Sequence, residues 1–103
     1  MRKLPPVDFK ILRDTISPIA ALNFLGWRGR REPCGNWRGP CPIHGSTSAR
    51  SRSFSVSDRV CYCFKCRWHG DAVALWAAVH HLSQLEAAHG LCAVLGMIPP
   101  PLS

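Results

Sequence analysis

Apolar side chains recur at helical spacing in two stretches near the start of the chain. The first covers residues 8–15, directly after a pair of prolines, and the second begins at Ser17-Pro18 and stops at Gly26. A serine N-cap, a proline in the first turn and a glycine after the last apolar position are ordinary helix signals. The pattern therefore predicts two short helices before residue 27.

The same periodicity returns in residues 71–96. One helix should begin at Gly70 or Asp71 and run to about His81, and Ser83 should cap a second. The second carries apolar positions at helical spacing: Leu85, Ala88, Leu91, Cys92 and Leu95. Residues 97–103 contain three consecutive prolines and are expected to end regular structure.

The middle of the chain has a different pattern. Residues 28–53 are rich in Arg, Gly, Pro and Ser, which indicates loops and short strands. Residues 53–57 alternate, with Phe54 and Val56 on one face, and residues 60–64 form a second strand candidate. Asp58-Arg59 would join these strands in a tight hairpin, although the usual glycine is missing. The expected fold class is α+β: a short antiparallel sheet flanked by N- and C-terminal helices, in a single domain over 1–103.

Composition adds a strong charge asymmetry to this picture. Apolar residues make up 47% of the 103 residues, which excludes a disordered tail, and 13 Lys+Arg stand against 6 Asp+Glu. Residues 28–69 hold nine of the basic and two of the acidic residues, so they carry the whole net charge of +7. Such concentration indicates a polyanionic partner, and the alternative is a charged surface that only maintains solubility.

Two pairs of possible metal ligands lie within the basic segment. Cys41 and His44 are separated by two residues, as are Cys63 and Cys66. Turns of this length let both side chains of a pair converge on one tetrahedral ion, and three thiolates with one imidazole describe a closed, structural zinc site. Zinc-linked folding is worth about 10 kcal/mol or more in small domains, which would compensate for the loop-rich middle of the chain.

Other cysteines and histidines of the chain could compete as ligands. Cys61 shares a strand face with Cys63 and could compete, but only Cys63 makes the two-residue gap with Cys66. His69 is the best substitute ligand. Cys34 is expected to be an exposed thiol, and Cys92 belongs to an apolar helix face.

Arginines interleave with aromatic residues in the same segment, and this combination suits single-stranded nucleic acid. Basic side chains bind phosphates, and aromatic rings stack on unpaired bases. The expected contacts are Arg38, Arg50, Arg52, Arg59, Lys65, Arg67, Trp37 and Trp68. Phe54 and Phe64 are interpreted as core residues, because a small ribbon needs them.

Catalysis and membrane insertion are not expected. The six acidic residues form no close cluster for the Mg²⁺ ions of nucleotidyl transfer. No apolar run approaches the roughly 20 residues of a membrane span, and the start lacks a signal core, so a cytoplasmic protein is expected. The alternative function is a protein-docking ribbon, with helices 71–81 and 84–95 as the contact; Leu75 and Trp76 could take part, although core positions suit them better.

Four motifs in order resemble the Cys-His-Cys-Cys zinc-binding domain of bacterial and phage DNA primases. They are Trp37-Arg-Gly-Pro-Cys-Pro-Ile-His44, Ser53-Phe-Ser-Val56, Cys63-Phe-Lys-Cys66 and Gly70-Asp-Ala72, and the resemblance covers roughly residues 8–97. It implies a zinc ribbon of antiparallel strands with one structural Zn²⁺ held by Cys41, His44, Cys63 and Cys66. It also implies that Phe54 and Phe64 sit on the sheet and that Arg38 faces template DNA.

The resemblance also bears on partners. It covers the zinc-binding domain and not the catalytic or helicase-binding domains of that family. The chain is therefore expected to bind single-stranded DNA as an accessory to a replication, priming or mobile-element protein, with a primase, helicase or transposition protein as its partner.

Overall fold

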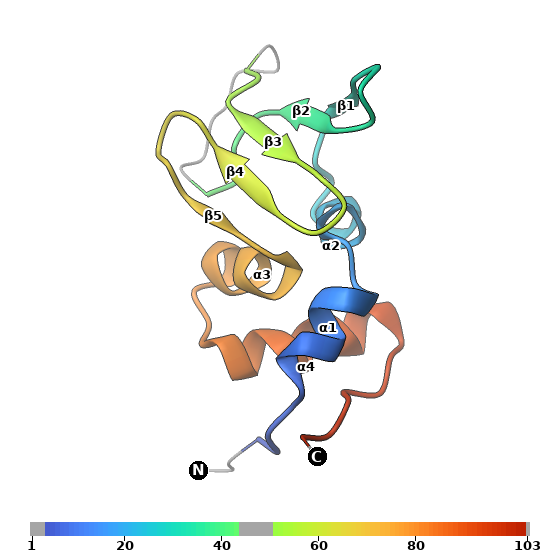
Figure 1. Cartoon of the computed structure of the whole chain (residues 1–103). Helices are drawn as coiled ribbons and strands as arrows, with labels where there is room; N and C mark the ends of the chain where they lie inside the picture. The colour runs from blue at the N-terminus through green and yellow to red at the C-terminus, as the bar shows by residue number, and fades with distance from the viewer. Residues whose placement is uncertain (1–3, 44–50, 103) are drawn as a thin grey trace.

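The computed structural model describes residues 4–43 and 51–102, in which a sheet occupies one end of the molecule and three of the helices gather at the other (Figure 1). The elements in chain order are α1 (Phe9–Thr15), α2 (Pro18–Phe24), β1 (Arg30–Arg31), β2 (Trp37–Gly39), β3 (Phe54–Val56), β4 (Cys61–Cys63), β5 (His69–Gly70), α3 (Ala72–His80) and α4 (Gln84–Leu95). The predicted α+β class is confirmed.

The five strands form one antiparallel sheet in the order β1-β2-β3-β4-β5, so each strand pairs with its neighbour in sequence. The predicted hairpin joins β3 and β4. Ser57 closes this turn with two hydrogen bonds. Its amide donates to the Val60 carbonyl at 2.9 Å, and its hydroxyl donates to the same oxygen at 2.8 Å. Strands β1 and β5 are two residues long and carry no pattern of their own, so periodicity does not predict them.

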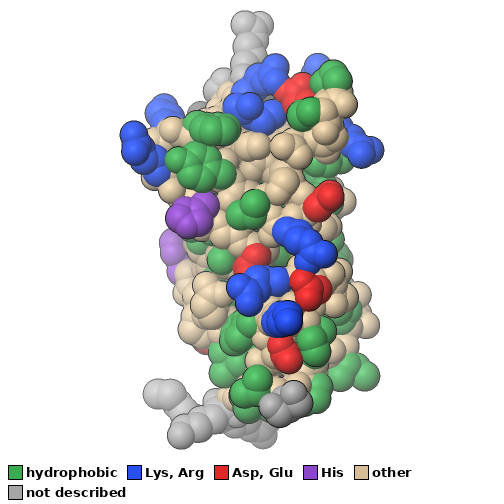
Figure 2. All heavy atoms as spheres, viewed as in Figure 1, with side chains coloured by type: hydrophobic (Ala, Val, Ile, Leu, Met, Phe, Trp, Pro, Cys, Tyr) green, Lys and Arg blue, Asp and Glu red, His purple; other side chains and the backbone are tan. Residues whose placement is uncertain are grey.

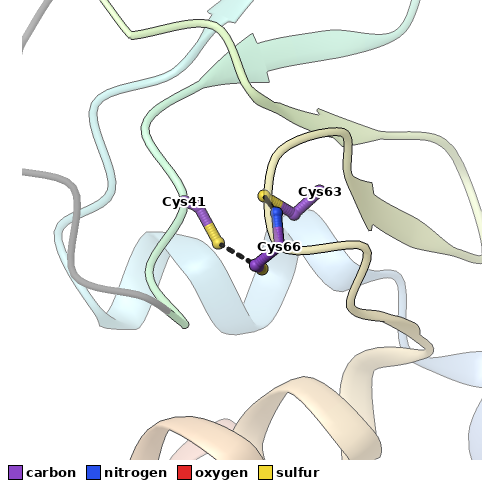
Figure 3. A group of neighbouring side chains, drawn as sticks. All are labelled: Cys41, Cys63 and Cys66. Atoms are coloured by element: carbon purple, nitrogen blue, oxygen red, sulfur yellow. Dashed lines mark hydrogen bonds between the residues drawn. The ribbon is translucent and has the colours of Figure 1, made fainter.

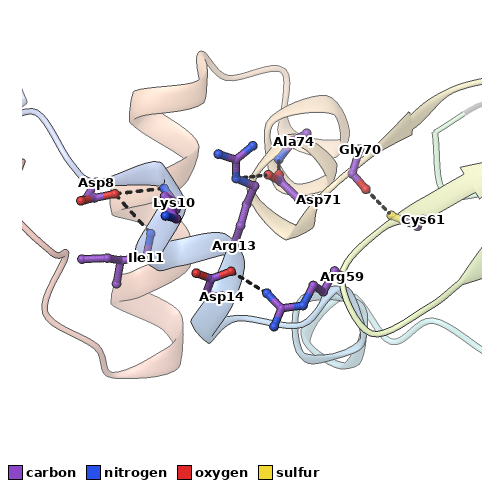
Figure 4. Close-up of polar contacts among 10 residues, drawn as sticks. All are labelled: Asp8, Lys10, Ile11, Arg13, Asp14, Arg59, Cys61, Gly70, Asp71 and Ala74. Carbon is purple, nitrogen blue, oxygen red and sulfur yellow. Dashed lines mark hydrogen bonds and ion pairs between the residues drawn. The ribbon is translucent and has the colours of Figure 1, made fainter.

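Helices α3 and α4 begin at the predicted N-cap residues, Asp71 and Ser83. The Asp71 carboxylate accepts a hydrogen bond from the Ala74 amide at 2.9 Å (Figure 4). Ser83 and Glu86 form a reciprocal capping box, with both bonds at 3.1 Å. At α2, Ser17 occupies the expected N-cap position but makes no side-chain capping bond among the described residues, so Pro18 alone marks that start.

The core lies between the sheet and the helices. Phe54 and Val56 of β3 and Cys61 and Cys63 of β4 are buried on one face of the sheet, in the same hydrophobic cluster as residues of the helices. Helices α3 and α4 pack against each other through side chains that include Leu75, Trp76, Leu91 and Cys92. Leu75 and Trp76 are therefore core residues and are not available to a docking partner.

The proline-rich end differs from expectation because it is tied into the structure. The Asp8 amide donates to the Pro100 carbonyl at 2.9 Å, and Val7 bridges to Pro101. Proline lacks an amide donor but keeps a carbonyl acceptor, which is what the N-terminal segment uses here. The described segments before α1 and after α4 consequently lie together (Figure 1).

None of the helices that the structure describes could cross a membrane. In the part of the chain that the structure describes, even α4, with 12 residues, lacks the length and apolar character that a bilayer requires.

Candidate metal centre and nucleic-acid interface

Three of the four predicted metal ligands meet at one point (Figure 3). Cys41 follows β2, Cys63 ends β4, and Cys66 lies in the turn after β4. The three sulfur atoms lie within 4.8 Å of one another, and the Sγ atoms of Cys41 and Cys66 are 3.9 Å apart. Thiols from the ends of two separate strands, β2 and β4, are thus brought into one cluster.

The turn after β4 aims two of these sulfurs at the same place. The Arg67 amide donates to the Cys63 carbonyl at 2.8 Å, and the Cys66 amide donates to Cys63 Sγ at 3.3 Å. Arg67 adopts φ 63°, a left-handed conformation that few residues other than glycine take. The burial of Cys63 raises its pKa, but hydrogen bonds from Cys66 and Lys65 outweigh this and bring the pKa down to about 6. A thiolate, the form that binds metal, is therefore favoured at neutral pH.

The geometry of the three sulfurs fits zinc. A zinc–sulfur bond of about 2.3 Å in a tetrahedron separates ligand sulfurs by about 3.8 Å. The 3.9 Å between Cys41 and Cys66 agrees with that spacing. His44, the predicted fourth ligand, lies outside the described residues.

Cys61 and His69, the competing candidates, do not join this cluster. The Cys61 thiol donates to the Gly70 carbonyl at 3.3 Å (Figure 4). Burial, together with the charges of Asp71 and Cys41, raises the pKa of Cys61 to about 12, so it stays protonated. The ring of His69 instead stacks on Tyr62, with centroids 6.3 Å apart.

The outer face of the sheet carries a row of side chains in which arginines lie on one side of a central serine and aromatic rings on the other. Residues directly opposite in antiparallel strands point to the same face. The register aligns one residue from every strand: Arg30, Arg38, Ser55, Tyr62 and His69. We call these five residues the outer row. Its side chains alternate with the buried residues of β3 and β4, so the row faces away from the core side of the sheet.

Phe64 belongs beside the outer row, and its assignment to the core is wrong. Its side chain is 59% exposed, whereas Phe54 is 0% exposed. Strand alternation explains the difference, because Phe64 continues the face of Tyr62 and not that of Cys63. The ring lies 5.0 Å from Tyr62 in an edge-on contact, and the Arg38 guanidinium lies over it at 4.9 Å. Alternation through Tyr62 was a signal in the sequence that could have found this residue.

The two tryptophans predicted to stack on bases lie on the other side of the sheet. Trp37 pairs with Val56, a buried residue, and is half-buried against the core. Trp68 stacks on Phe54 with centroids 6.2 Å apart. The aromatic rings of the outer face are therefore Tyr62 and Phe64.

The predicted basic contacts fall into three groups. Arg38 lies in the outer row and donates to the Arg52 carbonyl at 3.1 and 2.5 Å, while Arg52 pairs with Glu32. Arg59 pairs with Asp14 of α1 at 2.5 Å, toward the helical end (Figure 4). The third group is exposed in the turn after β4 and comprises Lys65 and Arg67. Arg50 lies outside the described residues.

Basic side chains gather at the sheet end of the molecule, whereas basic and acidic side chains mix near the middle (Figure 2). The described residues of the basic segment, 28–43 and 51–69, fold into this end, so the charge asymmetry of the sequence becomes an asymmetry of the surface.

A solved structure that is similar to this chain also contains a zinc-binding domain. The chain is similar to part of a crystal structure of the Aquifex aeolicus primase that contains its zinc-binding and RNA polymerase domains, with a TM-score of 0.72 and 27% sequence identity. The similarity covers 88% of this chain and 22% of that one, so the chain spans about a fifth of the primase structure. No protein of curated function matches the chain.

The family assignment rests on most of the domain. The CHC2 zinc finger family of DnaG type matches residues 30–100, which include the three clustered cysteines and the whole sheet. Family and cluster together point to one structural zinc ion. The chain belongs to the CHC2 zinc finger family, the zinc-binding module of DnaG-type primases.

Proposed function

We propose that this primase-type zinc module binds single-stranded DNA through the outer face of its sheet. The outer row is the observation that carries the proposal, because it joins two arginines, a serine, a tyrosine and a histidine across the five strands. A structural role does not require such a row, since a solvent-facing sheet needs only polar side chains.

The chemistry of this face suits an unpaired strand. Arginine guanidiniums bind backbone phosphates, and exposed aromatic rings stack on bases that are not paired. Phe64 is exposed beside Tyr62 and is covered on one side by Arg38. We therefore assign stacking to Tyr62 and Phe64 instead of Trp37 and Trp68, and phosphate contacts to Arg38 with the exposed Lys65 and Arg67.

Zinc supports this interface indirectly. We propose Cys41, His44, Cys63 and Cys66 as its ligands, with the fourth position closed so that no substrate reaches the metal. Cys41 follows β2 and Cys63 ends β4, so the ion would fasten the strands that carry Arg38 and Tyr62. We expect no catalysis by the chain itself, which is consistent with a binding role. We infer that the chain acts in the cytoplasm as an accessory to a replication, priming or mobile-element protein.

The salt dependence of DNA binding tests this function. Fluorescence anisotropy of the zinc-loaded protein should show tighter binding to single-stranded than to duplex DNA. For three to five phosphate contacts, the slope of log affinity against log salt should lie between about −2 and −4. Equal binding to both forms of DNA would contradict stacking on unpaired bases, and no binding to either would refute the proposal.

Replacement of Arg38 should distinguish a specific DNA contact from a general effect of net charge on DNA affinity. Arg38→Ala removes a phosphate contact and the cation above Phe64, so single-stranded DNA should bind about tenfold more weakly. Arg13→Ala removes the same charge from α1, where only a 3.9 Å contact to Asp71 is lost, and should change affinity less than twofold. Zinc content should be unchanged in both variants. Equal losses in the two variants would place the interface elsewhere.

A second function, protein docking, is favoured by apolar side chains at the helical end. Phe9 and Ile11 on α1 and Val94 on α4 are exposed, and Ile98 after α4 is 90% exposed. These residues replace Leu75 and Trp76 as candidate contacts. A partner complex that is insensitive to salt would identify this function, because apolar contacts are not screened by ions.

A further inference from the structure

An arginine-lined cavity opens beside the outer row, at its β1–β2 end. It has a volume of about 450 Å³ and lies between the β1–β2 hairpin and the residues that lead into β3. Its charged walls are Arg28, Arg30, Arg31, Arg38, Arg52 and Glu32. A cavity of this size is within the range of small-molecule binding sites.

The charge in this cavity is far from balanced. Five arginines line it, and Glu32 is the one acidic residue that the described part of the chain contributes to its wall. That carboxylate already pairs with Arg52. The cavity therefore holds a strong positive field that the described protein groups leave largely uncompensated.

The backbone register works against this arrangement. Arg30 and Arg38 are direct partners across β1 and β2. Like charges placed opposite each other in an antiparallel pair destabilise the sheet. An anion bound between the two guanidiniums would attract both and offset their repulsion. Anion binding would therefore explain why two arginines stand opposite each other here, which packing does not explain.

Arg38 is also held in position before any ligand arrives. It donates two hydrogen bonds to the Arg52 carbonyl, at 3.1 and 2.5 Å, and its guanidinium lies over the Phe64 ring. Pre-positioned arginine forks bind phosphate oxygens with geometric specificity. The remaining lining residues that the structure describes are Gly39 and Ser51, so no aromatic ring is present to hold a base.

We propose that this cavity binds a compact polyphosphate, the triphosphate chain of a nucleoside triphosphate or of a 5′-triphosphorylated strand. The ligand chemistry follows from the walls: a triphosphate concentrates several negative charges in a small volume, whereas each phosphodiester of DNA carries one. The proposal goes beyond binding of single-stranded DNA, because it concerns a chain end or a free nucleotide and uses Arg28, Arg30 and Arg31.

Isothermal titration of the zinc-loaded chain with inorganic triphosphate, at fixed ionic strength, tests the site. Saturable one-to-one binding is expected, and inorganic monophosphate should bind at least tenfold more weakly. Arg28→Gln and Arg30→Gln should each weaken triphosphate binding about tenfold, because each removes a charged donor from the cavity wall. Arg13→Gln is the matched control: it removes the same charge from α1, outside the cavity, and should leave triphosphate affinity unchanged.

Two outcomes would overturn the proposal. Equal affinity for monophosphate and triphosphate would show no polyphosphate site, and equal losses in Arg13→Gln and Arg30→Gln would show attraction to net charge alone. Binding of a 5′-hydroxyl single strand, measured in parallel, reports on the proposed DNA function separately. If the site binds triphosphate, comparing adenosine triphosphate with a 5′-triphosphorylated and a 5′-hydroxyl oligonucleotide identifies which source of triphosphate it prefers.

Discussion

Cys63→Ser is expected to abolish zinc binding and to unfold the sheet. The sulfur of Cys63 lies within 4.8 Å of those of Cys41 and Cys66, and a serine hydroxyl is a poor substitute for a thiolate toward zinc. Structural zinc contributes about 10 kcal/mol or more, which is comparable to the whole free energy of unfolding of a small domain. Native mass spectrometry should detect the metal-free chain, and far-ultraviolet circular dichroism should show the lost strands.

Cys61→Ser provides the matched control for this experiment. Cys61 lies on the same strand and is equally buried, but its thiol donates to the Gly70 carbonyl instead of facing the cluster. A serine hydroxyl can donate to the same oxygen, so this variant should keep one zinc ion and its fold. Equal loss of zinc in both variants would contradict the choice of Cys63 over Cys61.

Phe54→Ala is expected to cause a large loss of stability without removing a ligand. Phe54 is fully buried between Trp27 and Trp68, whose rings lie 6.1 and 6.2 Å from its own. Truncation of a buried phenylalanine costs about 3–5 kcal/mol, because it removes apolar contacts and leaves a cavity. Chemical denaturation of the zinc-loaded protein measures this change in the free energy of unfolding.

Phe64→Ala is the companion variant, and it should give the opposite result. The ring is exposed, so its removal should lower stability by less than about 1 kcal/mol. Stacking on one base is worth about 1–3 kcal/mol, so the affinity for single-stranded DNA should fall at least fivefold. A stability loss equal to that of Phe54→Ala would contradict the placement of Phe64 on the outer face.

Several features of the fold follow from local patterns. Ser83 and Asp71 cap α4 and α3 as expected, because a side-chain oxygen placed before an apolar helical run satisfies free backbone amides. The β3–β4 hairpin follows from alternation in two neighbouring segments. The approach of Cys63 and Cys66 follows from spacing, since a two-residue gap forms a turn that aims both sulfurs at one point, whereas Cys41 reaches them from the end of another strand.

Other features depend on partners that are distant in sequence. Ion pairs joining Arg52 to Glu32 and Arg59 to Asp14 determine which arginines remain available to a ligand, and no local pattern encodes those pairs. The bond from Asp8 to Pro100 fixes a segment that composition alone marks as the end of regular structure.

The sequence by itself determined the helices, the hairpin, the Cys63–Cys66 pair and the basic middle segment, because each depends on residues a few positions apart. Tertiary structure decided which side of the sheet each aromatic ring occupies. It also aligned Arg30 with His69 across five strands and enclosed the arginine cavity. Those arrangements arise when strands pair in a particular register and one face is buried, and both depend on contacts throughout the folded domain.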